Sequence, residues 1–200
     1  MKEVNEHINN NSILFLKLGE KYLRSAKVML KNMVENKNET VGIGDSEEQA
    51  IEDMNNKSEI SDITLFIPAL FCYLQGIELF EKGMILLKNN EFDPQENGGH
   101  IFENMLDKDI KKLYGQSSEV YKAFKKLIKF RFMIDKFKKT NNISNLKDMY
   151  QCLRYPINKN NKVDYTDLIM QGTKAIKYYK CLIDDIDCFI SIIVKEYHAR

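Results

Sequence analysis

The longest apolar stretch of the chain, residues 63–87 (ITLFIPALFCYLQGIELFEKGMILL), predicts a buried central helix. It is too long for a strand and apolar on too many faces for a surface helix. Charges near the middle of a membrane span are costly, so its polar interruptions favour a core helix. We interpret Glu78 and Glu81 as emerging at an edge of the bundle, with a site as the alternative. The interruptions are Gln75, Glu78, Glu81 and Lys82.

The start and the packing of this helix are also indicated by the sequence. Ser61 and Asp62 offer cap oxygens, and Pro68 suits a first turn, so we expect the regular helix to begin near Ile67. Small residues recur on one side, and glycine inside a helix costs about 1 kcal/mol against alanine. A partner helix is therefore expected to pack closely there. The small residues are Ala69, Cys72, Gly76 and Gly83.

Apolar residues spaced three or four apart predict further helices on both sides of the central one. The last of them carries a heptad seam from Ile169 to Tyr197, which predicts antiparallel core packing or a dimer contact. Between the first and the central helix, residues 36–61 are polar and acidic. They predict a long loop, with a short helix around 47–54 as an option. The further helices are expected at residues 13–34, 101–115, 117–139, 144–153 and 166–197.

Composition narrows the class of protein. Two hundred residues, 44% hydrophobic and 30% charged with three prolines, suit one helical domain over residues 1–200. The cysteines form no C-x-x-C pair, which indicates reduced, mostly buried thiols rather than a disulfide frame or a zinc site. No signal peptide or lipidation pattern is present, so we expect a cytoplasmic protein without a membrane partner. The cysteines are Cys72, Cys152, Cys181 and Cys188.

Charge is balanced overall, at +1, but not locally. Residues 108–139 hold eleven basic and three acidic side chains, a surplus of eight positive charges. Such a stripe can hold phosphates, or it can be a solvated face balanced by the acidic loop. An acidic cluster on the last helix is expected to pair with the positive charges of the basic helix rather than to bind a metal. The cluster consists of Asp184, Asp185 and Asp187. The lysines on one face of the basic helix are Lys122, Lys125, Lys126 and Lys129.

The sequence contains none of the common catalytic motifs that would assign an enzyme class. The chain has no phosphate-binding loop, no G-x-S-x-G elbow and no H-E-x-x-H. None of the three histidines (His7, His100, His198) completes the E-x-x-H pair of a di-metal bundle. We therefore expect neither a cofactor nor a metal.

Several segments, taken in order, resemble the HEPN family (higher eukaryotes and prokaryotes nucleotide-binding). They are FLKLGEKYLRSAKVML, LQGIELFEKGMILL, GGHIFENML, LRYPIN and GTKAIKYYKCLIDDI. The resemblance implies an all-α, up-and-down bundle of about four to six helices, with the 36–61 loop inserted between the first and second main helices. HEPN domains commonly dimerise, so a homodimer or a partner protein is implied.

The resemblance also implies a function. Many HEPN proteins are metal-independent ribonucleases of toxin–antitoxin, CRISPR-linked and phage-defence systems. These carry Arg, then four to six residues, then His, with histidine as acid/base and arginine at the phosphate. No arginine of this chain is followed by a histidine at that spacing. The chain is therefore expected to be a non-catalytic member that binds RNA, a nucleotide or a partner protein.

If a ligand site exists, we expect it in a groove bordered by five residues from three segments, with phosphate contacts from the basic helix. Two alternatives stay open. One is a ribonuclease with a departed site, for which the candidates are His100, Arg154 and Glu78, or His100 with Lys129. The other is a plain interaction bundle. The five groove residues are Gln75, Glu78, His100, Arg154 and Tyr155.

Overall fold

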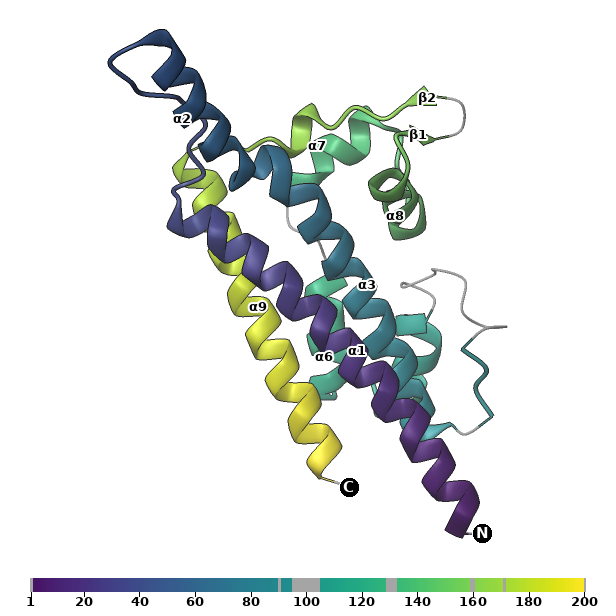
Figure 1. Ribbon diagram of the computed structural model, residues 1–200. Coiled ribbons are helices and arrows are strands. Elements are labelled where there is room, and N and C mark those ends of the chain that lie inside the picture. The colour runs from purple at the N-terminus through teal and green to yellow at the C-terminus, as the bar shows by residue number, and fades with distance from the viewer. Residues whose placement is uncertain are drawn as a thin grey trace.

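The computed structural model describes residues 2–89, 91–94, 105–128, 133–158, 161–170 and 172–199. The chain is all-α, as predicted. Three long helices form its frame: α1 (Lys2–Glu35), α3 (Asp62–Lys88) and α9 (Thr173–His198). Helix α1 runs antiparallel to both α3 and α9 and lies between them (Figure 1).

Shorter elements complete the bundle. Helix α6 (Glu119–Ile128) packs against α9, and α8 (Leu146–Arg154) packs against α3. A two-residue hairpin follows α8, with Ile157 opposite Lys162 and Asn158 opposite Asn161. The remaining elements are α2 (Glu47–Glu59), a π-helical turn η1 (Met105–Ile110), α5 (Lys111–Tyr114), α7 (Met133–Thr140), β1 (Ile157–Asn158), β2 (Asn161–Lys162) and a 3₁₀ turn η2 (Thr166–Leu168).

The small-residue face of α3 packs against α1, which confirms the predicted close approach. A Cβ added at Gly76 would lie 2.7 Å from Leu23 Cγ and 3.1 Å from the carbonyl oxygen of Gly19. One added at Gly83 would lie 2.8 Å from a methyl group of Leu16. Glycine therefore permits a backbone contact here that any larger residue would obstruct.

The start of α3 differs from the prediction. The helix begins at Asp62 rather than near Ile67, and Pro68 lies inside it. Pro68 cannot donate to the carbonyl of Thr64, but Thr64 is exposed, so water can satisfy that oxygen.

Asp62 is a buried junction rather than a helix cap. Asn38, in the turn after α1, donates to its Oδ2 at 2.9 Å, and Tyr179 of α9 donates to the same oxygen at 3.1 Å. The backbone N–H of Met170 also donates to Asp62. One carboxylate thus connects the end of α1, the start of α3 and the α9 segment.

The acidic segment is more helical than predicted. Helix α2 covers 13 residues, and Ser46 caps it by accepting from the backbone N–H of Gln49 at 3.2 Å. Asp53 and Lys57 pair one turn apart at 2.8 Å. None of its residues is buried, so the sequence has no apolar face there from which the full helix could be predicted. Helix α2 extends away from α6 (Figure 1), so the acidic segment does not cover the basic helix.

The last helix begins at Thr173, not at Thr166. Gly172, at φ 82°, separates it from η2, and Ile169 is 41% exposed outside the seam. Beyond Ile169 the seam packs in the core in part, because four of its residues are buried, while Ile176, Ile183 and Tyr197 are half-buried. The buried seam residues are Tyr179, Ile186, Ile190 and Ile193. The alternative of a dimer contact stays a prediction. Phe189 beside the seam meets Phe80 and Phe124 edge to face, at 5.1 and 4.9 Å between ring centroids.

Helices α6 and α7 occupy the two ends of the predicted helix over 117–139, and residues 129–132 lie outside the described residues. The prediction of mostly buried thiols needs correction. Of the cysteines, only Cys152 is buried, Cys72 and Cys181 are half-buried, and Cys188 is exposed. Burial raises the pKa of the Cys72 thiol.

By length and composition, the segment containing α3 is apolar enough to cross a membrane. A helix at the centre of a protein core passes the same test, and Phe66, Leu74 and Ile77 of α3 are fully buried against other helices.

Candidate functional site

Glu78 and Glu81 lie in the protein interior, and the prediction that they emerge at an edge is wrong. Their exposed fractions are 2% and 0%, and that of Lys82 is 8%. Lys82 donates to Glu78 Oε1 at 2.7 Å. A buried carboxylate is tolerated when an opposite charge and hydrogen bonds compensate its lost hydration, and Lys82 supplies both.

Tyr150 of α8 links the predicted groove residues. Its hydroxyl donates to Gln75 Oε1, and its ring stacks on Phe71 at 5.2 Å between centroids. Burial, followed by the nearby Glu78 carboxylate, raises the pKa of Tyr150 to about 12. A phenol that stays neutral can hold its hydrogen bond to Gln75 across the physiological range.

Arg154 and Tyr155 form the exposed part of this arrangement. The Arg154 guanidinium carbon lies 5.5 Å from the ring centroid of Tyr150 and 5.2 Å from that of Tyr155, both within cation–π range. Tyr155 has the extended backbone predicted for a residue before proline, and it is 48% exposed. The surface therefore presents a cation beside an accessible aromatic ring.

The structure thus brings four of the five predicted groove residues around Tyr150, namely Gln75, Glu78, Arg154 and Tyr155. We call these four residues together with Tyr150, which lies at their centre, the Tyr150 cluster. His100, the remaining groove residue, lies outside the described residues. Sequence reasoning missed Tyr150, although it lies four residues before Arg154 on a helix and so shares a face with it.

The candidate catalytic groups do not assemble an acid/base pair within the described residues. Glu78 is buried and holds Lys82, so its carboxylate is placed to stabilise the interior rather than to reach a ligand. Arg154 is exposed, and a guanidinium side chain binds anions rather than transferring protons. His100 and Lys129 lie outside the described residues.

Two of the three described lysines on the basic face of α6 pair with nearby acids. Lys122 pairs with Glu119 at 3.0 Å, and Lys126 pairs with Asp185 of α9 at 2.6 Å. Lys125 lies over the ring of Tyr121, 5.6 Å from its centroid. The partners thus come from α6 itself and from the acidic group on α9, not from the acidic segment. Asp187 pairs with Lys27 of α1 instead.

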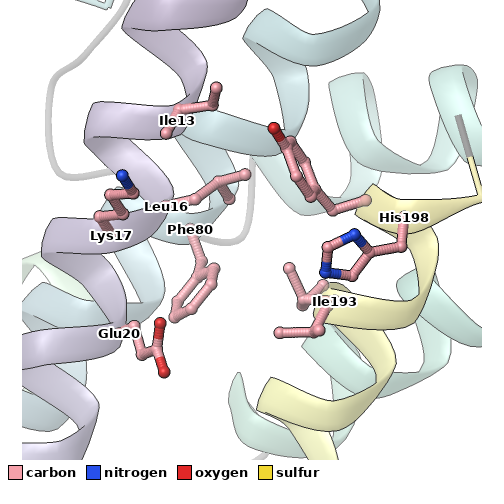
Figure 2. Close-up of a pocket in the computed structure, with 9 residues that line it drawn as sticks. Ile13, Leu16, Lys17, Glu20, Phe80, Ile193 and His198 are labelled. Carbon is pink, nitrogen blue, oxygen red and sulfur yellow. The ribbon is translucent and has the colours of Figure 1, made fainter.

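A cleft of about 320 Å³ opens between α1 and α9, away from the Tyr150 cluster. Leu16 and Phe80 form its floor, and Ile193 closes it from α9 (Figure 2). Its rim includes charged and titratable side chains, with Lys17 and Glu20 on α1 and His198 on α9. The other lining residues are Ile13, Val194 and Tyr197.

Among the residues that the structure describes, no group of three His, Cys, Asp or Glu side chains is placed to hold a metal ion. Comparisons with protein-family models, with curated proteins and with solved structures found no match to this chain. The HEPN resemblance of the sequence therefore stays a prediction.

Proposed function

We propose that this chain is a non-catalytic, HEPN-like helical protein of a prokaryotic defence or toxin–antitoxin type system, and that it binds single-stranded RNA or a nucleotide at the Tyr150 cluster. The observation that carries the proposal is the exposed Arg154–Tyr155 pair. An aromatic ring offers a stacking surface to an unpaired base, and a guanidinium offers charge-assisted hydrogen bonds to a phosphate.

The interior beneath the pair supports this assignment. Gln75 fixes the Tyr150 hydroxyl, and Tyr150 in turn lies under the Arg154 guanidinium. A cation held over a ring loses less side-chain freedom on binding than a free surface arginine does. The pair is therefore organised before a ligand arrives.

The test is fluorescence anisotropy of a labelled, unstructured RNA at low and at moderate salt. Tyr155→Ala is expected to weaken binding about 5- to 150-fold, the usual value of one base-stacking contact. Arg154→Gln is expected to weaken binding and to flatten its salt dependence by about one phosphate contact. Lys180→Gln on α9, which removes the same charge from an exposed site elsewhere, is the matched control.

Three results would contradict the proposal. Absence of binding at low salt would leave a protein-interaction bundle as the better description. Equal losses in Arg154→Gln and Lys180→Gln would show general charge attraction rather than a site. Degradation of the RNA in the absence of metal would establish the ribonuclease alternative. A separate variant, with Lys122, Lys125 and Lys126 all changed to Gln, tests the basic helix.

A further inference from the structure

The cleft between α1 and α9 has the form of a small-ligand site. Its floor consists of side chains that already belong to the core, since Leu16, Phe80 and Ile193 are buried. Its volume of about 320 Å³ lies at the lower end of the range for small-molecule pockets, about 300–1,000 Å³. An apolar body placed on this floor would be removed from water on the side that faces the protein.

The charges at the rim define the sign of the ligand. The Glu20 carboxylate is already occupied, because its Oε1 accepts from Arg24 Nε at 2.8 Å and from Nη2 at 2.6 Å. Lys17 is exposed and makes no hydrogen bond or ion pair with the part of the chain that the structure describes. The rim therefore carries a carboxylate that Arg24 already engages, and the Lys17 ammonium group, which forms no ion pair within the part of the chain that the structure describes.

The far wall adds a polar group. The His198 ring extends from the last turn of α9 toward the cleft, opposite the α1 residues (Figure 2). A neutral imidazole carries one N–H group, which can donate a hydrogen bond to an anion when it points into the cleft. The polar groups thus lie at the rim, above an apolar floor.

We propose that this cleft binds a small amphiphilic anion, a medium-length hydrocarbon with a single carboxylate. The hydrocarbon lies on Leu16, Phe80 and Ile193, and the carboxylate lies at the rim beside Lys17. Burial of the chain supplies most of the affinity, and the ammonium selects an anionic head over a neutral or cationic one. The proposal is independent of RNA binding at the Tyr150 cluster.

The test is isothermal titration of the full chain with three eight-carbon probes: octanoate, 1-octanol and octylammonium. Octanoate is expected to bind about tenfold more tightly than 1-octanol, which corresponds to one hydrogen bond to a charged group. Lys17→Gln is expected to abolish that difference while leaving 1-octanol binding unchanged.

Two substitutions of uncharged residues at exposed positions locate the binding site. Val194 lines the cleft and is 43% exposed, so Val194→Phe is expected to fill the space and to weaken all three probes without unfolding the protein. Leu14 lies on α1 but does not line the cleft, and it is 64% exposed. Leu14→Phe is therefore the matched control and is expected to bind like the parent chain.

Several outcomes would overturn the proposal. Octylammonium binding as tightly as octanoate would show that the rim does not select an anion. Binding that Val194→Phe and Leu14→Phe reduce equally would place the ligand elsewhere. Absence of binding, together with a dimer on sizing that only Val194→Phe dissociates, would make the cleft a contact between two copies of the chain.

Discussion

The buried Glu78–Lys82 pair gives the sharpest stability prediction. The two side chains are nearly inaccessible and their charged atoms lie 2.7 Å apart. At an effective dielectric constant of 20, that separation corresponds to a gross attraction of about 6 kcal/mol. Desolvation costs several kcal/mol for each ion, so the net contribution of the intact pair is small.

Loss of one partner has a much larger effect than loss of both. Lys82→Met keeps the stem of the side chain but leaves the Glu78 carboxylate buried without its ammonium. Removal of one member of a buried pair costs about 3–5 kcal/mol. Since domains are stable by about 5–15 kcal/mol, that cost is a large part of the total. The double variant Glu78→Leu/Lys82→Met is expected to recover most of the loss, because neither charge of the pair is then buried without the other.

Urea denaturation followed by circular dichroism measures these differences, with an unchanged m-value as the sign that the unfolded state is the same. Lys122→Met is the matched control, because Lys122 also pairs with a glutamate on its own helix but is exposed. It is expected to change stability little, as exposed pairs do. Two results would refute the reasoning: a Lys82→Met cost below about 1 kcal/mol, or a double variant as unstable as the two single losses added together.

Three further predictions concern packing, titration and the α3 junction. Gly76→Ala is expected to lower the melting temperature, because the new Cβ would lie 2.7 Å from Leu23 Cγ. The gain in helix propensity, about 1 kcal/mol, does not offset that overlap. A higher melting temperature would contradict this prediction. Tyr150, with its pKa raised to about 12, is expected to ionise after ordinary tyrosines in an ultraviolet titration. Because Tyr150 ionises at a lower pH in the unfolded chain than in the folded one, its contribution to the free energy of unfolding is fully present below about pH 10 and is lost as pH rises toward 12. Tyr150→Phe should lessen that loss. Asn38→Ala is expected to cost about 1–3 kcal/mol in urea denaturation, because the buried Asp62 loses two hydrogen bonds, whereas Asn56→Ala on exposed α2 should cost little.

Local patterns were sufficient for the frame of the bundle. The length and apolar composition of residues 63–87 predicted the central helix, and its small residues predicted the close partner that α1 provides. Both inferences depend only on helix periodicity and on the space that glycine leaves. The start of α9 was harder, because Gly172 interrupts an apolar spacing that continues through η2.

The candidate site was predictable only in part. The segment around Arg154 and Tyr155 was identified, and Pro156 correctly indicated its extended backbone. Tyr150 was missed because its role depends on α8 packing against α3, a contact between residues 75 positions apart. The interpretation of Glu78 as an edge residue failed for a local reason. A helix apolar on all sides has no solvated edge, and Lys82 one turn later was the sign of an internal partner.

The central position of α3 explains why one helix serves both proposed sites. Gln75 belongs to the Tyr150 cluster and Phe80 to the floor of the cleft. Five residues of α-helix rotate direction by about 140°, so these side chains leave α3 on different sides. Helix α3, which packs against α1 and α8, then lies between the two sites. It follows that Tyr155→Ala should leave octanoate binding unchanged and that Val194→Phe should leave RNA binding unchanged.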